Sequence, residues 1–223
     1  MTMPKDDVEP DAAGFVLAGG RSSRMGVDKA LVELAGQPLV VHALRLLRDA
    51  GLSASIAGAQ SSLAAYAPVV EDARADSGPL AGVCAALASC SARYAVFVPV
   101  DLPFLPASLV AWMLHYARVQ DAAVTVPSVN GYGQTFPAVV DRAALPALEA
   151  SLDSGNRGCF SAFQAAAAQL HRPLTVVGVE MLIQAGQVSH PEALPATQWF
   201  LNVNSPADLR RADAILRRSH RVS

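Results

Sequence analysis

Residues 14–29, GFVLAGGRSSRMGVDK, join a short apolar run to a loop that is rich in glycine and positive charge. The apolar run over residues 14–18 predicts a buried β-strand, which ends directly at Gly19 and Gly20. Backbone amides next to glycine can turn toward an anion, and nearby cations can neutralise its charge. The cations of this loop are Arg21, Arg24 and Lys29. The stretch therefore predicts a strand that leads into a phosphate-binding loop.

The lysine of this loop is unusual in the composition of the chain. Only two of the 17 basic side chains are lysines, Lys5 and Lys29. An ammonium group is a compact point charge, whereas a guanidinium group is a wide planar fork, so we expect the shape of the cation to matter at Lys29. The loop is not a Walker A loop, because that motif places its lysine directly after the second glycine and Lys29 lies three positions past Gly26.

Downstream of the loop, strand-like and helix-like segments alternate. Such alternation predicts βαβ units and a mostly parallel sheet with helices on both faces. Strands are predicted over residues 53–57, 68–70, 94–100 and 122–126, and helices over residues 38–50, 79–91 and 106–118.

The second half of the chain is more mixed. It predicts extended segments over residues 134–140, 174–179 and 200–203, helices over residues 143–152, 159–170 and 206–218, and a loop or loose helix over residues 180–198. Neither repeats nor a low-complexity linker divide the chain. We expect one domain over residues 12–218, with flexible tails over residues 1–11 and 219–223.

The composition excludes several classes of function. A net charge of −2 provides no basic surface for nucleic acid or anionic lipid. The longest uncharged stretch, residues 122–140, contains prolines and glycines and cannot span a membrane. The first eleven residues are polar and acidic, unlike a signal peptide. The three cysteines lack metal-ligand spacing, so we expect a reduced, cytoplasmic protein that binds neither nucleic acid nor membrane.

A carboxylate follows the most apolar strand, in VFVPVDLPFLP, residues 96–106. Asp101 lies where that strand ends, and ligands of open parallel sheets bind outside the carboxyl ends of the strands. Mg²⁺ prefers one or two carboxylates together with phosphate oxygens, so Asp101 is a candidate metal ligand. The alternative is a structural role, as a helix N-cap or in a turn ahead of Pro103.

Two further stretches carry polar residues next to predicted turns. VVEDARADSGPLAGV, residues 69–83, supplies Asp72 ahead of a glycine-rich turn. FLNVNSPADL, residues 200–209, carries Asn202 and Asn204. The Ser-Pro-Ala-Asp sequence that follows them is a typical helix start, but a helix start does not explain Asn202.

Together, LAGGxSxRMGxDK, EDxxxxxGPLAG, VDLPFLP and NVNSPADL resemble the molybdenum cofactor guanylyltransferases over residues 14–218. These cytoplasmic enzymes join the GMP part of GTP to the phosphate of molybdopterin and release pyrophosphate. The resemblance implies a single nucleotidyltransferase domain, a three-layer α/β/α sandwich of the nucleotide-diphospho-sugar transferase type. It also implies Mg²⁺, with Mn²⁺ as the alternative cation. Transient contacts with proteins that deliver molybdopterin or mature molybdoenzymes are expected as well.

The same resemblance assigns roles to individual residues. It implies that Lys29 meets the phosphates and that Asp101 holds the metal, with Arg24 as the third charge in catalysis. The remaining nucleotide-binding residues are expected to be Leu17, Ala18, Gly19, Gly20 and Asp72. The residues expected on the pterin side are Asn202, Asn204, Arg157 and Gln134.

The sequence departs from the family pattern at three places. The family often has asparagine at the end of the second strand, where this chain has Ala57 and Gly58. Residues 134–137 read QTFP where Gln/His-Pro-Leu is usual, and the connection over residues 180–198 is longer than usual.

Three alternatives remain open at this stage. A related molybdopterin cytidylyltransferase would resemble LAAG rather than LAGG, and we interpret glycine at position 19 as room for the larger purine. A sugar-phosphate nucleotidyltransferase shares the fold and the opening motif, but not NVNSPADL. The third alternative is a nucleotide-binding accessory protein without catalysis, which the presence of both Lys29 and Asp101 argues against.

Overall fold

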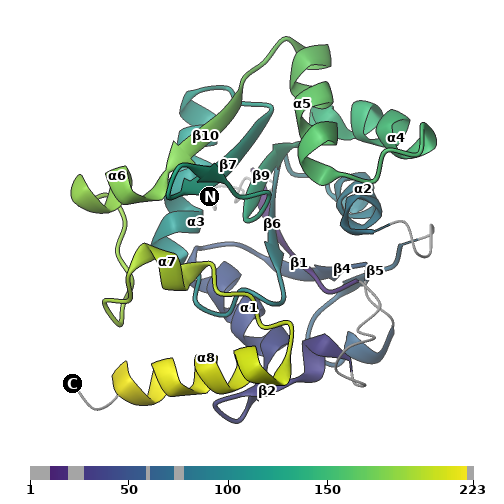
Figure 1. Cartoon of the computed structure of the whole chain (residues 1–223). Helices are drawn as coiled ribbons and strands as arrows, with labels where there is room; N and C mark the ends of the chain where they lie inside the picture. Colours follow the sequence, from purple (N-terminus) through teal and green to yellow (C-terminus); the bar gives the residue numbers. More distant parts are fainter. Residues whose placement is uncertain (1–10, 20–27, 59–60, 73–77, 220–223) are drawn as a thin grey trace, which may run out of the picture.

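The computed structural model describes residues 11–19, 28–58, 61–72 and 78–219. Over these residues the chain forms one large sheet with the strand order β10-β7-β9-β6-β1-β4-β5, and β8 pairs with β7 (Figure 1). Strands β9 and β8 run antiparallel to their neighbours, and the other pairs are parallel. The strands are β1 (Ala12–Leu17), β4 (Ala54–Ala57), β5 (Val69–Val70), β6 (Tyr94–Pro99), β7 (Val124–Val129), β8 (Tyr132–Gly133), β9 (Ala138–Asp141) and β10 (Leu174–Gly178).

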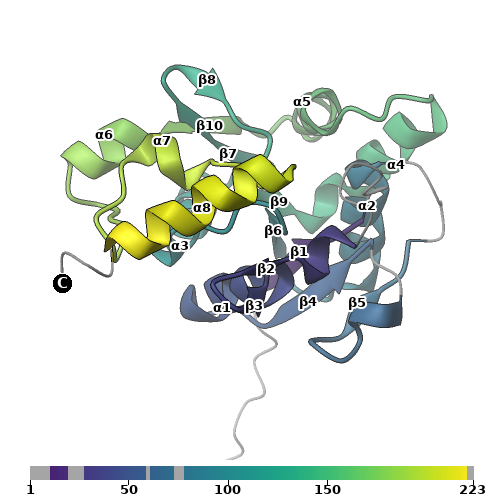
Figure 2. The same cartoon turned by 60° about the horizontal axis from the view of Figure 1, so that its bottom comes forward.

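Helices cover both faces of this sheet, so the expected three-layer α/β/α architecture and its mostly parallel sheet are confirmed (Figures 1 and 2). One apolar core joins the sheet to α1 (Leu39–Asp49), α3 (Ala107–Val119), α7 (Ala196–Trp199) and α8 (Pro206–Ser219). The second core joins it to α2 (Pro79–Ser89), α4 (Leu145–Asp153) and α5 (Cys159–Leu170). The smaller elements are α6 (Val179–Gln184), the hairpin of β2 (Glu33–Leu34) and β3 (Gln37–Pro38), and the 3₁₀ turns η1 (Lys29–Leu31), η2 (Ser61–Leu63) and η3 (Arg142–Ala144).

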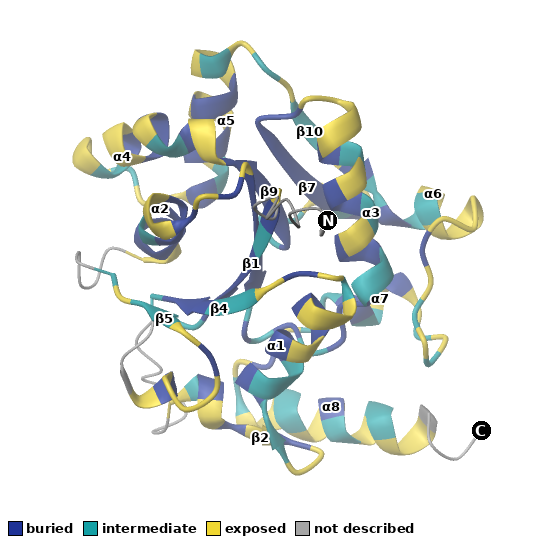
Figure 3. Cartoon of the chain, turned by 180° about the vertical axis from the view of Figure 1, so that it is seen from behind, coloured by how far each residue is buried: buried dark blue, intermediate teal, exposed yellow. Residues whose placement is uncertain are grey.

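The continuous apolar run of β6 explains its central position. Every residue from Tyr94 to Val98 is buried, on both faces of the sheet. The strands β9 and β7, which follow it in the order of the sheet, are likewise mostly buried and appear dark blue in Figure 3. β6 pairs in parallel with β1, where Val16 lies opposite Val98. A strand with one face in solvent alternates apolar and polar residues. The uninterrupted apolar run of β6 therefore favours a position in the middle of a sheet that is covered on both faces.

One prediction for the second half of the chain needs revision. The strand predicted over residues 200–203 is wrong, because only the Val203 amide makes a sheet-like bond there, to the carbonyl of Asp101 (2.9 Å). The connection over residues 180–198 begins in α6 and ends in α7, with an irregular segment between them. The expected tails lie almost entirely outside the described residues, although Asp11 accepts a hydrogen bond from Arg118 (2.8 Å).

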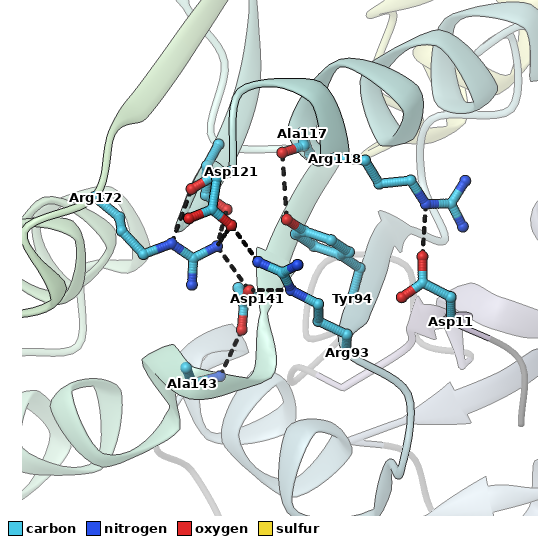
Figure 4. Close-up of polar contacts among 10 residues, drawn as sticks. Asp11, Arg93, Tyr94, Ala117, Arg118, Asp121, Asp141, Ala143 and Arg172 are labelled. Atoms are coloured by element: carbon cyan, nitrogen blue, oxygen red, sulfur yellow. Dashed lines mark hydrogen bonds and ion pairs between the residues drawn. The ribbon is translucent and has the colours of Figure 1, made fainter.

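A network of ion pairs lies at the edge of the sheet where β6 and β7 begin (Figure 4). The carboxylate of Asp141 is almost fully buried and accepts bonds from Arg93 Nε (3.0 Å), Arg172 (2.8 Å) and the Ala143 amide (2.8 Å). Asp121 binds the same two guanidinium groups from the surface. Burial of Asp141 disfavours its charged form, but these bonds outweigh the burial and lower its pKa from the ordinary 3.8.

We expect Asp141→Asn to lower the free energy of unfolding by about 2 kcal/mol at pH 7, because two guanidinium groups lose a buried counter-charge. The folded-state pKa of Asp141 lies below the unfolded one, so its contribution is complete above the unfolded pKa and lost as the pH falls through the folded pKa. Urea unfolding of both proteins from pH 7 to pH 2 measures this. A stability difference that stayed constant down to pH 2 would contradict the assignment.

Candidate active site

The carboxyl ends of four neighbouring strands place the predicted site residues along one edge of the sheet. Strands β6, β1, β4 and β5 are adjacent and parallel. The residues that follow them are therefore brought to a common edge, which is where open parallel sheets bind ligands. They are Asp101 after β6, Gly19 after β1, Gly58 after β4 and Asp72 after β5.

Lys29 lies at this edge, against the carboxylate that follows β6. The Asp28 side chain accepts a bond from the Ala30 amide (3.0 Å) and so starts the 3₁₀ turn that carries Lys29. The ammonium Nζ is 2.6 Å from Asp101 Oδ2 and also donates to Asn204 Oδ1. Three segments far apart in the sequence thus meet at one cation. The Lys29 and Asp101 side chains are both about one-fifth exposed, so a solute can reach them.

The backbone of Asp101 joins the centre of the sheet to the C-terminal segment. The preceding residue, Val100, donates to the Leu17 carbonyl (3.1 Å), and the Asp101 carbonyl accepts from Val203 (2.9 Å). Asp101 lies in a turn ahead of Pro103, as one form of the structural alternative predicted. The other form, an N-cap role for Asp101, is wrong because Pro106 is the N-cap of α3. The Asp101 carboxylate contacts Lys29 instead.

A reciprocal cap at the start of α8 holds Asn204 in place. The Asp208 amide donates to Ser205 Oγ (3.2 Å), and Asp208 Oδ2 accepts from Ser205 Oγ (2.7 Å) and the Asn204 amide (3.1 Å). The bonds from Ser205 and then from Asn204 lower the pKa of Asp208. The helix start predicted at this point is confirmed. Asn204 was predicted on the pterin side, and its side chain accepts a hydrogen bond from Lys29, which was predicted to meet the phosphates.

The other residues predicted to bind the nucleotide fall at or near the same edge. Leu17 is buried at the end of β1, Ala18 donates to the Ala57 carbonyl (3.1 Å), and Asp72 is partly buried just beyond β5. Gly20 and Arg24 lie in residues 20–27, outside the described residues.

The residues predicted on the pterin side are dispersed. Asn202 is exposed, two residues before Asn204. The Gln134 side chain donates to the Tyr132 carbonyl (3.1 Å) within its own hairpin. Arg157 is exposed on the loop that leads into α5, in the layer of the sandwich opposite α7 and α8. The structure therefore brings Asn204, but not Gln134 or Arg157, into contact with Lys29.

Glycine at position 19 is required by the packing of the protein's own backbone. A Cβ atom built on Gly19 would lie 2.3 Å from the carbonyl oxygen of Gly58. The missing side chain therefore makes room for the backbone that follows β4. Gly58 was noticed in the sequence only as a departure from the family pattern, because the contact with Gly19 is long-range.

A family model covers most of the chain, including the residues that follow β1, β4, β5 and β6. The model of the MobA-like NTP transferase domain matches residues 14–172. The chain belongs to the MobA-like NTP transferase family. Among the relatives of this MobA-like chain are proteins named molybdenum cofactor guanylyltransferase. That of Cupriavidus metallidurans is 39% identical over 66% of this chain and 77% of its own. That of Pseudomonas putida is 37% identical over 68% and 81%.

Solved structures share the fold of this MobA-like chain. Molybdopterin-guanine dinucleotide biosynthesis protein A of Archaeoglobus fulgidus superposes with a TM-score of 0.74 at 21% identity, over 92% of this chain and 99% of that one. The 2-C-methyl-D-erythritol 4-phosphate cytidylyltransferase of Thermus thermophilus gives 0.62 at 19% identity, over 91% and 98%. The expected nucleotide-diphospho-sugar transferase fold is therefore confirmed.

The oxygen donors at this edge suit a hard cation that is bound partly by the protein and partly by phosphate oxygens of the substrate. Among the described residues, no group of three or more His, Cys, Asp or Glu side chains could hold a metal alone. Asp101 provides one carboxylate at the edge, and Mg²⁺ is commonly bound by one or two carboxylates plus substrate phosphates. A related fold has been solved with manganese, in Mycobacterium tuberculosis Rv0371c, with a TM-score of 0.60 at 18% identity over 92% of this chain and 98% of that one.

Proposed function

We propose that this protein transfers GMP from GTP to the phosphate of molybdopterin, forming the guanine dinucleotide and pyrophosphate. The observation that carries the proposal is the meeting of Lys29, Asp101 and Asn204 at the carboxyl edge of the sheet. Membership of the MobA-like family, with relatives named molybdenum cofactor guanylyltransferase, supports the choice of substrates. In the described residues, no helix has the length and apolar character needed to cross a membrane.

The reaction is a displacement at the α-phosphorus of GTP. A phosphate oxygen of molybdopterin forms the new bond to phosphorus, and the bond to the pyrophosphate oxygen breaks. Such transfers depend on positioning and on neutralising phosphate charge more than on a covalent nucleophile. The compact ammonium of Lys29 fits that task, because it can exchange a contact with Asp101 for one with a phosphate oxygen.

The nucleotide half of the site is proposed to consist of Leu17, Ala18, Gly19, Gly20, Lys29, Asp72 and Asp101, with Arg24 as a further catalytic charge. Asp101 would hold Mg²⁺, or Mn²⁺ in its place, which supplies Lewis acidity and neutralises phosphate charge when bound. The remaining residues, Asn202, Asn204, Arg157 and Gln134, are proposed for the pterin half.

The setting of the reaction is a further part of the proposal. Cys84, Cys90 and Cys159 are buried and form no disulfide bond, which supports a reducing, cytoplasmic setting. Transient contacts with proteins that deliver molybdopterin or mature molybdoenzymes would let the acceptor arrive and the product leave without exposure to solvent.

GTP with Mg²⁺ is expected to raise the melting temperature, and CTP is not. A ligand at ten times its Kd that binds only the folded state stabilises it by about 1.4 kcal/mol. For a chain of this size that corresponds to an increase of roughly 3–6 °C. Differential scanning fluorimetry with GTP, CTP, ATP and UTP measures the effect. Equal increases with GTP and CTP would remove the guanine assignment and favour the cytidylyltransferase alternative.

Transfer itself is tested by incubating the protein with GTP, Mg²⁺ and molybdopterin. Mass spectrometry of the product and release of pyrophosphate are the two measurements. Binding of GTP without pyrophosphate release in the presence of molybdopterin would favour the non-catalytic alternative.

A further inference from the structure

The loops that follow β1 and β4 touch through their backbones. The Ala18 amide donates to the Ala57 carbonyl (3.1 Å), and the next residues, Gly19 and Gly58, lie against each other. A Cβ atom on Gly19 would lie 2.3 Å from the oxygen, 3.1 Å from the carbonyl carbon and 3.2 Å from the Cα of Gly58. Cβ atoms essentially never approach other heavy atoms to less than 3.0 Å. The backbone of Gly58 therefore fills the place of a side chain at position 19.

The conformation of Gly58 makes this contact. Its φ of +73° lies in the left-handed region, which costs glycine little and other residues more. Its amide donates to the Val70 carbonyl (3.1 Å), so the turn is anchored to β5. A Cβ atom on Gly58 itself would meet Gly19 and Gly82 only at ordinary contact distances of 3.5–3.7 Å. The requirement for glycine at position 58 is therefore conformational rather than steric.

We propose that Gly58 is a positioning residue for the nucleotide. Its left-handed turn presents a carbonyl against which Gly19 packs, and this contact fixes the main chain that begins the glycine-rich loop. The inference rests on the proposed function, because it takes that loop to bind the nucleoside triphosphate. It also predicts that a side chain at position 19 displaces the backbone of Gly19 from Gly58 and weakens binding of the nucleotide.

Gly58→Ala tests the role of the turn, and Gly51→Ala is its matched control. Gly51 also has a left-handed φ, +81°, but lies in the turn between α1 and β4, where an added Cβ would meet nothing within 4 Å. Both variants carry the same backbone strain, so we expect similar decreases in melting temperature. Isothermal titration should give a Kd for GTP raised about tenfold in Gly58→Ala and unchanged in Gly51→Ala. A Kd unchanged in both would overturn the proposal.

Gly19→Ala tests the same contact from the other side. We expect it to weaken GTP binding at least tenfold, because its Cβ would meet the carbonyl oxygen of Gly58. Gly14→Ala is the control, since its Cβ would meet Leu47 and the Ser53 carbonyl at 3.0 Å, a packing defect near the other end of the same strand. It should lower the melting temperature but leave the Kd for GTP unchanged. A Kd for GTP unchanged in a folded Gly19→Ala variant would overturn the inference.

Failure of the inference is distinguishable from failure of the proposed function. The wild-type protein is first titrated with all four nucleoside triphosphates, and the ratios between variants are then measured with the one that binds. Preference of the wild type for another base would contradict guanylyl transfer. The Kd of Gly58→Ala for that nucleotide, divided by the Kd of Gly51→Ala, would still test the positioning role. If Gly19→Ala does not fold, the Gly58→Ala comparison decides.

Discussion

Asp101→Asn is expected to lower the turnover of GMP transfer about a thousandfold and to leave the melting temperature nearly unchanged. Asparagine carries no charge to hold a divalent cation against a triphosphate or to balance the ammonium of Lys29. Loss of that stabilisation corresponds to about 4 kcal/mol in the barrier. The fold should persist, because the cap of α3 is Pro106 and the carbonyl that accepts from Val203 belongs to the backbone.

Asp121→Asn is the matched control for this prediction. It also replaces a carboxylate with an amide, but at the edge of the sheet where β7 begins, in the ion-pair network of Arg93 and Arg172. Its left-handed φ of 48° is one that asparagine tolerates. Turnover should stay at the wild-type rate in Asp121→Asn. The proposed catalytic centre is wrong if Asp101→Asn also transfers GMP at the wild-type rate in Mg²⁺.

Lys29→Arg is expected to lower kcat/KM between a hundredfold and a thousandfold, although the positive charge is kept. The ammonium lies between two acceptors from different segments, Asp101 Oδ2 and Asn204 Oδ1, in a space that suits a point charge. A guanidinium group places its charge farther along a planar fork and cannot occupy the same position. Losing one preorganised donor to a transition-state oxygen costs about 3–4 kcal/mol. Steady-state kinetics with GTP as the varied substrate measures the loss.

The reverse exchange provides the control. Arg45 lies on α1 and donates to Gln37 at the surface (2.8 Å), so Arg45→Lys changes the shape of a cation away from the site. We expect wild-type kinetics from that variant. Full activity in Lys29→Arg would contradict the prediction that catalysis requires the compact ammonium group of Lys29.

Local patterns in the sequence predicted the parts of the fold and the site that depend on local physics. The apolar run before Asp101 predicted a buried central strand and, with it, the position of Asp101 at the sheet edge. The helix start at residues 205–208 was likewise predicted from its capping residues. Each of these features is decided within about ten residues of the chain.

Contacts between distant segments could not be predicted in the same way. The contact between Lys29 and Asn204 joins residues 175 positions apart, and neither carries a local sign of the other. The packing of Gly19 on Gly58 depends on the order of β1 and β4 in the sheet, which periodicity does not give. The strand predicted over residues 200–203 was wrong for the same reason, because sheet bonds need a partner strand.

The span of 175 residues between Lys29 and Asn204 has a consequence for how the protein is made. At about 5–20 residues per second, a ribosome needs roughly 9 to 35 s to synthesise the second after the first. During that time Lys29 exists without its contact to Asn204. Premature termination before Asn204 would release chains that lack the contact altogether. The contact between Lys29 and Asn204 can therefore form only after the C-terminal segment has been synthesised. Fragments from which proteolysis has removed that segment would not retain the contact.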